Sequence, residues 1–381
     1  MSRRKKMVCI AVLMLLAAIM RAGPNWMFWK RAFTYPDKQI TNVRWYRPLE
    51  EIRSQAEVPL AVATPEARQI PPAVIAQISD YAQLRNSCGL LILHEGKIVA
   101  EKYWQGHRAD SLSNSMSMAK TVMALLIGLA IAEGKIGSDT DPAANYLEEW
   151  RNDNRRHIKI RDLLQMTSGL RCSQNPRNPF SDINQMHLGL SLGDYVLTIP
   201  AEQGPGQTFQ YNNANTQILN VVLERATGKR YSDYLAEKLW QPLGNGPAYV
   251  WLDQPHGTAK VYGAIFATTH DWARLGLLLL NRGRVQRRQI VPEAWIAKMV
   301  APSPHNSEYG YHVWLASATG SVRKKDRREP FAALDLFYLD GRAKQKVYVI
   351  PSRQLVIVRV GENAKEWDDS YLPNTLVRSL P

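Results

Sequence analysis

The sequence predicts an α/β (α+β) domain in which one antiparallel sheet is built from both chain ends and a helical lobe is inserted between its strands. Strand-like runs lie near residues 89–104 and again near 345–360. Between them, helical stretches alternate with loops that contain Pro and Gly. A chain of 381 residues with 45% hydrophobic content can bury a large core, in one large or two intimately packed domains.

The N-terminus has the pattern of a targeting segment. Basic residues 3–6 precede an uncharged, mostly apolar run from Met7 to Met20. Residues 1–30 are therefore predicted to be a signal peptide or an uncleaved membrane anchor. In the second case residues 7–29 would enter the membrane, and the aromatic side chains near their end would lie at its interface. Either alternative predicts an exported protein, periplasmic or anchored in the inner membrane and facing the periplasm.

Charge and histidine spacing exclude several classes of protein. Lys and Arg exceed Asp and Glu by 14, but no zinc-finger spacing or RNA-binding motif accompanies them, so nucleic acid is not an expected partner. A negatively charged membrane or cell wall suits this charge better. The eight histidines are scattered without metal-ligand spacing, so neither a metal nor another cofactor is predicted.

Two cysteines lie in the part of the chain predicted to be exported. Cys88 and Cys172 could pair in an oxidising compartment, or remain as two unpaired buried thiols. Both alternatives stay open, because no sequence rule fixes their separation in space.

The first part of the predicted mature chain is an N-terminal extension, residues 31–76, which is rich in Pro and Arg and precedes a helix near Pro71 to Leu84. Residues 77–381 form the predicted main domain. It begins with a β-hairpin whose strands, Gly89 to His94 and Lys97 to Trp104, flank a Glu-Gly turn.

A buried helix is predicted from Ser117 to Glu133. Lys120 is its only charged residue between the ends, and Gly134 provides the stop. A helix that is apolar on all sides is a buried helix, and this one is too short to span a membrane. Further helices are expected at 160–166, 216–226, 231–239, 269–281 and 292–299, and strands at 345–350 and 355–360.

The lysine in this buried helix indicates chemistry. An unpaired charge in a low-dielectric site costs several kcal/mol in order of magnitude, so Lys120 needs a reason to be there. Ser117 lies three residues before it, on the same helical face and at the helix N-terminus, where free N–H groups and the dipole favour negative charge. Ser117 is the predicted nucleophile and Lys120 a predicted catalytic partner.

Ser-x-x-Lys spacing alone is weak evidence, because it also occurs at Ser2 and at Ser321, within a targeting tail and a run of charges. A second element strengthens it. Tyr211 and Asn213 form the Tyr-x-Asn triplet of the chain, in a polar loop before a helix. A lysine beside a phenol favours the phenolate, which makes Tyr211 a candidate catalytic base.

With these motifs the sequence resembles the serine β-lactamase and penicillin-binding-protein superfamily, in particular the class C β-lactamase-related branch with its esterases and 6-aminohexanoate-dimer hydrolases. The resemblance extends from about Cys88 to Val377. It is carried by Ser117-Met-Ala-Lys120, Tyr211-Asn-Asn213, Ala130-Ile-Ala-Glu-Gly-Lys-Ile136, Ile160-Arg-Asp-Leu-Leu-Gln-Met-Thr-Ser-Gly-Leu170, Gln241-Pro-Leu-Gly244, Ala267-Thr-Thr-His-Asp-Trp-Ala-Arg274 and Tyr309-Gly-Tyr311. It implies a β-lactamase/transpeptidase-like fold and acyl-enzyme chemistry.

The third family motif, a Lys-Thr-Gly triplet on the strand beside the site, is absent from this sequence. The matching place holds Gly341-Arg342-Ala343-Lys344-Gln345, which looks like the Gly-x-x-Gly-Gln of the 6-aminohexanoate-hydrolase-like group with Lys344 in place of the second glycine. The resemblance implies that Gly341, Arg342 and Ala343 support the substrate and that Arg342 or Lys344 meets a substrate carboxylate. The backbone N–H groups near Arg342 and of Ser117 are the expected oxyanion hole.

The predicted function is a serine hydrolase that cleaves an amide or ester bond in a small-molecule or peptide-like substrate through a Ser117 acyl-enzyme. Asn213 is expected to hold Lys120 or the substrate amide. Tyr309, Tyr311 and Trp314 would wall the pocket or pack in the core. The alternatives are a penicillin-binding D-Ala-D-Ala peptidase, a non-catalytic envelope protein that binds peptide or peptidoglycan, and a membrane-bound scaffold.

Overall fold

The computed structural model describes residues 26–65, 69–317 and 326–380. Most of the predicted targeting segment, residues 1–25, therefore lies outside the described residues. The boundary predicted at residue 30 falls inside the first described helix, α2 (Trp26–Phe33). No helix within the described ranges has both the length and the apolar character that crossing a membrane requires.

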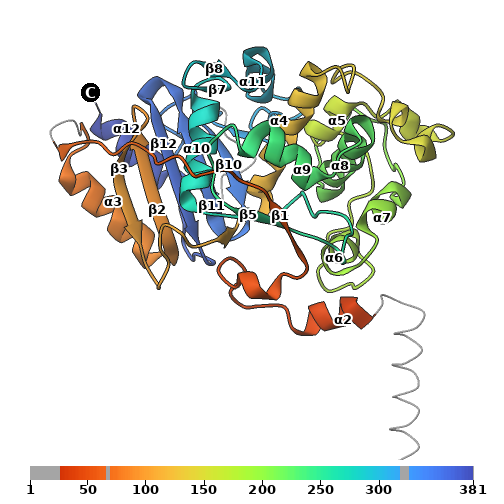
Figure 1. Cartoon of the computed structure of the whole chain (residues 1–381), viewed down its shortest axis with the longest axis horizontal. Coiled ribbons are helices and arrows are strands. Elements are labelled where there is room, and N and C mark those ends of the chain that lie inside the picture. The colour runs from red at the N-terminus through yellow and green to blue at the C-terminus, as the bar shows by residue number, and fades with distance from the viewer. Residues whose placement is uncertain (1–25, 66–68, 318–325, 381) are drawn as a thin grey trace, which may run out of the picture.

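The larger sheet confirms the predicted architecture, because strands from both chain ends form it (Figure 1). Its order is β3-β2-β12-β11-β10-β9 and every neighbouring pair is antiparallel. The early strands are the predicted hairpin and the late ones include the two predicted strands, while β10 and β9 were not predicted. The bounds are β2 Ser87–His94, β3 Lys97–Tyr103, β9 Trp314–Leu315, β10 Phe337–Gly341, β11 Gln345–Ile350 and β12 Leu355–Gly361.

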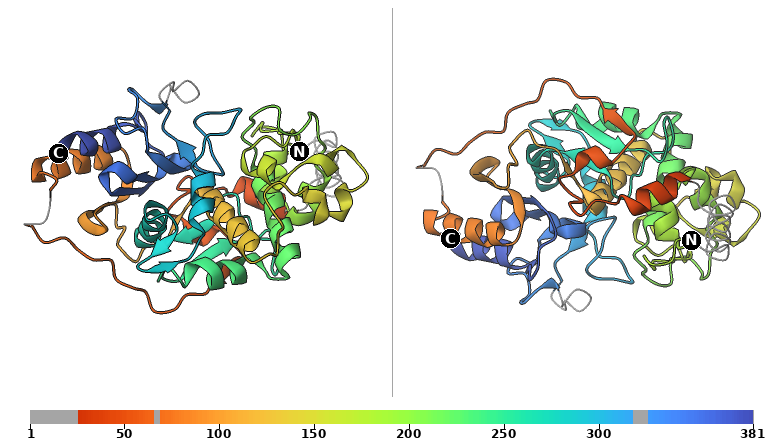
Figure 2. Two further views of the ribbon diagram at one scale, coloured as in Figure 1. Left: turned by 90° about the horizontal axis from the view of Figure 1, so that it is seen from above. Right: turned by 90° about the horizontal axis from the view of Figure 1, so that it is seen from below.

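Both faces of this sheet are covered, which explains why its central strands are apolar without alternation. Leu91 and Val358 belong to one hydrophobic cluster, on the side of the helical lobe, whereas Leu90 and Ile357 belong to a second cluster. Two terminal helices, α3 (Pro72–Leu84) and α12 (Tyr371–Ser379), lie side by side over this second face (Figure 2). The helix near Pro71 was predicted, and α12 was not.

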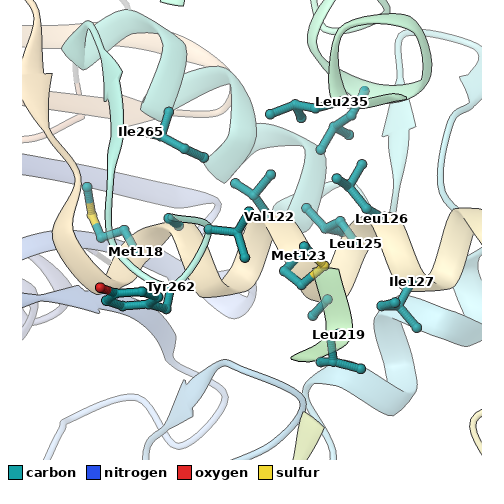
Figure 3. Packing of buried hydrophobic residues seen from close by; sticks show 14 of the residues in the cluster. Met118, Val122, Met123, Leu125, Leu126, Ile127, Leu219, Leu235, Tyr262 and Ile265 are labelled. Carbon is teal, nitrogen blue, oxygen red and sulfur yellow. The ribbon is translucent and has the colours of Figure 1, made fainter. Parts of the chain in front are cut away.

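The helical lobe surrounds α4 (Ala119–Ala132), which continues from the short 3₁₀ turn η3 (Met116–Met118). Val122, Met123 and Leu125 pack among side chains of neighbouring helices (Figure 3). The predicted buried helix is confirmed, since its residues from Ala119 to Ala130 are all buried. The other helices are α5 Ile160–Leu164, α6 Asp182–Leu188, α7 Leu192–Thr198, α8 Asn213–Thr227, α9 Tyr231–Leu235, α10 Thr269–Leu280 and α11 Glu293–Met299.

The N-terminal extension is part of the fold. Its strand β1 (Leu49–Ile52) is an edge of a second, four-stranded sheet of order β1-β5-β6-β4. The partners are β5 (Ala248–Trp251), β6 (Ile265–Ala267) and β4 (Ser113–Asn114), and β4 leads directly into η3. The strands β7 (Arg284–Val285) and β8 (Arg288–Gln289) form a separate small hairpin.

Cys88 and Cys172 are both free thiols, so the alternative in which they form a disulfide is wrong. Cys88 is buried in β2 of the larger sheet. Cys172 lies in the helical lobe, where its thiol donates to the carbonyl oxygen of Tyr211 at 3.5 Å. The fold places the two residues in different parts of the molecule, which the spacing in sequence could not reveal.

Candidate active site

Ser117 lies in η3, on a sharp turn between β4 and α4. Met116, immediately before it, has a φ of 48°, in the left-handed region that non-glycine residues adopt only when their surroundings impose it. Its N–H donates to Asn114 Oδ1 at 3.0 Å, and the Ser115 N–H donates to the carbonyl oxygen of Ile265 at 2.8 Å. These bonds fix the backbone before Ser117. They leave Ser117 in the first turn of the continuous helix formed by η3 and α4, where N–H groups have no partner within the helix.

Lys120 lies one turn further on and points back to Ser117. Its Nζ donates to Ser117 Oγ at 2.9 Å and to the carbonyl oxygen of Tyr262 at 2.6 Å. Only 2% of Lys120 is exposed, and this burial lowers the pKa of its ammonium group to about 7 although the carboxylate of Asp340 opposes the shift. A substantial fraction of Lys120 is therefore neutral at physiological pH and can accept a proton.

Tyr211 lies against the same lysine, with its ring centroid 5.1 Å from Lys120 Nζ. The ring lies nearly parallel to Trp314, at a centroid distance of 5.9 Å, and edge-on to Tyr309 at 6.1 Å. Trp314 and Tyr309 were both candidates for a pocket wall, and both lie beside Tyr211. Phe209, which sequence reasoning missed, completes this aromatic group through an edge contact with Tyr309.

Tyr311, the third aromatic candidate, lies elsewhere. Its hydroxyl donates to Asp139 Oδ2 at 2.8 Å and its ring packs edge-on against Trp295. Tyr309 and Tyr311 are two residues apart, yet they do not belong to one strand, because the chain bends at Tyr311 and at His312, which has a φ of 54°. Of the two alternatives for Tyr311, the pocket wall is therefore wrong and packing in the core is confirmed.

The loop that carries Tyr211 is fixed by the start of α8. Asn212 is the N-cap residue: its Oδ1 accepts from the Ala214 N–H at 3.0 Å, and its Nδ2 donates to the carbonyl oxygen of Arg171. The predicted contact between Asn213 and Lys120 is not made, because Nζ bonds instead to Ser117 and Tyr262. Asn213 Oδ1 is buried and has no hydrogen-bond partner among the described residues, so the alternative role, holding a substrate amide, remains a prediction.

The segment 341–345 approaches the site from the larger sheet, at the end of β10. Gly341 ends β10 against η3, so closely that a Cβ atom there would lie 2.4 Å from the carbonyl oxygen of Ser115. Ala343 and Lys344 follow with φ values of 60° and 65°. Lys344 thus occupies a glycine-favouring conformation at the position where the related motif has glycine. Its ammonium forms an ion pair with Asp326 at 2.8 Å, which leaves the exposed Arg342 as the better candidate for a substrate carboxylate.

Sequence reasoning missed the residue that holds this segment. Arg359 in β12 is completely buried, and its guanidinium donates to the carbonyl oxygens of Ala343 at 2.6 Å and of Arg85 at 2.9 Å. Gln345 adds a bond from its Nε2 to the carbonyl oxygen of Gly361. An arginine within an otherwise apolar strand was the available signal, because buried charges persist only with partners.

A buried histidine behind the site was also missed. The ring of His312 bonds through Nε2 to the Thr216 hydroxyl at 3.0 Å and through Nδ1 to the Tyr309 hydroxyl at 3.4 Å. Burial, reinforced by the charge of Lys120, lowers the pKa of His312 to about 3. His312 is therefore neutral at physiological pH and adds no positive charge next to Lys120.

Within the ranges that the structure describes, His, Cys, Asp and Glu side chains form no group of three or more that could hold a metal ion. The residues that do converge are a hydroxyl, a buried amine with a lowered pKa, a phenol ring and a tightly packed backbone segment. This set supports nucleophilic attack by Ser117 and proton transfer by Lys120.

The family model described as Beta-lactamase matches residues 74–373. The chain is 27% identical over 246 residues to the 6-aminohexanoate-dimer hydrolase of Paenarthrobacter ureafaciens. The matched region covers 60% of this chain and 62% of that enzyme, so the chain spans less than two thirds of the relative's length.

Two solved structures share the fold at low sequence identity. A penicillin-binding protein from Bacillus halodurans is 17% identical with a TM-score of 0.60, over 80% of this chain and 99% of that one. A family VIII carboxylesterase is also 17% identical, with a TM-score of 0.63, over 84% of this chain and 99% of that one. These likenesses confirm the β-lactamase/transpeptidase-like fold that the sequence motifs implied.

Proposed function

The chain belongs to the Beta-lactamase family, and from this premise we propose that it is a serine hydrolase that cleaves an amide or ester bond through an acyl-enzyme on Ser117. The observation that carries the proposal is the 2.9 Å hydrogen bond between Ser117 Oγ and a lysine whose pKa is lowered to about 7 by burial. A buried amine of this pKa accepts a proton from serine at neutral pH, which an exposed lysine does not.

Acylation follows from these positions. Ser117 Oγ attacks the carbonyl carbon of the substrate while its proton passes to neutral Lys120 Nζ. The backbone N–H groups of Ser117 and Arg342 stabilise the oxyanion that forms. The tetrahedral intermediate then collapses: the bond from carbonyl carbon to the amine or alcohol breaks, and that leaving group takes the proton, relayed by Lys120 and Tyr211.

Deacylation repeats these steps with water as the nucleophile. Water attacks the acyl carbon and gives one proton to the Lys120–Tyr211 pair, which returns it to Ser117 Oγ as the ester bond breaks. The products are a carboxylic acid and the regenerated serine. Tyr211, whose ring lies against Lys120 Nζ, is proposed to orient and share this proton.

The proposed substrate class is a small-molecule or peptide-like amide or ester. The similarity to a 6-aminohexanoate-dimer hydrolase supports an amide and the similarity to a carboxylesterase supports an ester. The D-Ala-D-Ala peptidase alternative is disfavoured by the missing Lys-Thr-Gly triplet, since Lys344 at the matching place is paired with Asp326.

We expect a fluorophosphonate to label the full-length protein once, and the label to be absent from Ser117→Ala. Intact-mass spectrometry after exposure to the reagent, and separately to a penicillin, measures this. The labelling rate should rise with pH and level off above about 7, because only neutral Lys120 accepts the serine proton.

A lasting penicilloyl adduct on Ser117 would favour the peptidase alternative. If folded protein reacted with neither reagent, the nucleophile assignment would be wrong and a non-catalytic binding protein would be the better explanation. Circular dichroism of the wild type and of Ser117→Ala provides the control for folding.

We propose that the protein is exported and remains periplasmic or anchored in the inner membrane, facing the periplasm. The basic residues 3–6 followed by the apolar run 7–20 support this. Fractionation of expressing cells, with N-terminal peptide mass spectrometry of each fraction, is expected to find the chain outside the cytoplasm. Recovery of the intact chain only in the cytosolic fraction would contradict it.

A further inference from the structure

A cavity of about 550 Å³ lies between α2 and α6, and the segment at 176–179 also lines it. Figure 1 shows α2 beneath α6, on the side of the helical lobe. The volume is in the range of small-molecule sites, which run from roughly 300 to 1,000 Å³. Residues of α2 lie outside residues 74–373, the part of the chain that the family model matches, so one wall of this cavity comes from outside the matched range.

The wall formed by α2 is firmly docked. Arg31 is 5% exposed, and its guanidinium donates to the carbonyl oxygens of Leu188 and Gly189, both at 3.1 Å, and of Asp253 at 2.7 Å. The same guanidinium lies 5.1 Å from the ring centroid of Trp251. A buried arginine whose two terminal nitrogens donate to carbonyl groups of other segments holds its helix in one place, so the cavity is built into the fold.

The cavity is amphiphilic. Apolar side chains from both helices line it, chiefly Phe28, Trp29, Ala32, Ile183 and Leu188. Its charged lining residues are Arg177 and Arg342, and neither Asp nor Glu is found among the described residues that line it. An apolar chain that ends in a negative charge matches this lining.

Three further polar groups belong to residues that line the cavity. The Tyr35 hydroxyl and His187 Nε2, both from lining residues, are hydrogen-bonded at 3.1 Å. Trp29 Nε1 is buried and has no acceptor among the described residues, which leaves one N–H donor unsatisfied in the cavity wall.

Arg342 connects the cavity to the candidate active site. Ser117 itself does not line the cavity. Gly341, the neighbour of Arg342 in the chain, packs against the backbone just before Ser117, while the Arg342 side chain lines the cavity. A ligand that fills the cavity therefore has its polar end beside the residue whose N–H is proposed for the oxyanion hole.

We propose that this cavity binds the apolar chain of an anionic amphiphilic ester or amide, with the anionic group at Arg342 and the scissile carbonyl at Ser117. The placement of the scissile bond at Ser117 rests on the proposed hydrolase function. The binding of the apolar chain in the cavity does not. It assigns the N-terminal helix α2 a role in substrate selection.

The test compares two tryptophans of α2. Trp29 lines the cavity, whereas Trp26 is 62% exposed and does not line it, so Trp26→Ala is the matched control for Trp29→Ala. We expect kcat/KM of the wild type to rise along series of p-nitrophenyl alkanoates and alkyl acetates, by up to about fourfold per methylene in the series whose chain enters the cavity. Trp29→Ala should reduce kcat/KM for the longest chain at least tenfold and leave kcat/KM for p-nitrophenyl acetate unchanged. Trp26→Ala should change neither value.

A second variant guards against unfolding of α2. Ala32→Phe adds volume inside the cavity, so the chain length with the highest rate should shorten while the melting temperature stays near that of wild type. Equal rates for all chain lengths, or equal effects of the two tryptophan substitutions, would overturn the inference and leave the hydrolase function intact.

Binding is measured separately in Ser117→Ala with a fluorescent fatty-acid probe, 11-(dansylamino)undecanoate. We expect decanoate to displace the probe at least tenfold better than decyltrimethylammonium, and Trp29→Ala to weaken probe binding tenfold. If wild type hydrolyses no ester through Ser117 but this binding pattern holds, the hydrolase proposal fails and the cavity assignment stands. Absence of probe binding, or preference for the cation, would overturn the cavity assignment.

Discussion

Lys120→Met is expected to reduce kcat/KM about 10⁴-fold or more, close to the effect of Ser117→Ala, because a nucleophile and its base act as one unit. Met keeps most of the length and the apolar character of the lysine stem but can neither accept the Ser117 proton nor donate to the Tyr262 carbonyl. Hydrolysis of an activated ester by the two variants measures this.

The same substitution is expected to stabilise the fold at neutral and acidic pH. Burial lowers the pKa of Lys120 from 10.5 to about 7, so folding of the charged form is opposed. This penalty is complete below about pH 7, declines between 7 and 10.5, and is absent above 10.5. After allowance for the lost hydrogen bonds, Lys120→Met should raise the free energy of unfolding at pH 6 by about 2 kcal/mol.

Lys346 provides the control for this prediction. It is also completely buried, but it is paired with Asp340 at 2.6 Å and Asp369 at 2.8 Å. Lys346→Met would leave two carboxylates without their cation and is expected to destabilise the protein at the same pH. Urea denaturation at pH 6 and pH 10 compares both variants with wild type. A Lys120→Met variant that is less stable at pH 6, or that keeps more than a hundredth of the activity, would refute the role of Lys120.

Gly341→Ala is expected to reduce kcat/KM about 10²-fold. The added Cβ would lie 2.4 Å from the carbonyl oxygen of Ser115 and 3.2 Å from Met116 Cβ, so the end of β10 and the turn at Ser117 must move apart. A shift of about 1 Å between nucleophile and oxyanion donors has an effect of this size. Steady-state kinetics with an activated ester measures the change, which should fall mainly on kcat.

Gly263→Ala is the matched control. Gly263 also packs on the backbone of Met116, but an added Cβ there would meet its nearest atom at 3.5 Å, an ordinary contact distance. We expect less than a threefold change in kcat/KM. Wild-type activity in Gly341→Ala, with a melting temperature unchanged from wild type, would show that the approach of β10 to η3 does not determine the chemistry.

The sequence predicted the elements whose local pattern is strong. The hairpin from β2 to β3, the helices α3, α8, α10 and α11, and the strands β11 and β12 were all confirmed within a few residues. The short strands β1, β4, β5, β6 and β9 were missed because runs of two to four residues carry too little periodic signal. The strand β10 was also missed, although its partner β11 follows it directly in the chain. Residues 231–239 were predicted as one helix, but α9 ends at Leu235 and a π-helical turn follows to Trp240.

Parts of the candidate site were predictable for the same reason. Ser117 and Lys120 are three residues apart on one helix, and that spacing alone places their side chains together. Tyr211 was a candidate because its Tyr-x-Asn triplet was combined with the lysine, but its contact with Lys120 joins residues far apart in the chain and could not be derived from spacing. The catalytic roles of these residues and of Asn213, Gly341, Arg342 and Ala343 remain proposals until the variants are measured.

What the sequence determined by itself was the fold class, the serine–lysine pair and the reaction type, because these depend on patterns within single elements and on motifs read in order. Only the tertiary structure decided that Lys120 is held by the Tyr262 carbonyl, that Arg359 supports the segment 341–345, and that α2 closes a cavity beside Arg342. Each of these depends on contacts between residues far apart in the chain. Burial, opposed by the charge of Asp340, sets the pKa of Lys120, and the docking of α2 sets the shape of the cavity. Both exist only after the chain has folded.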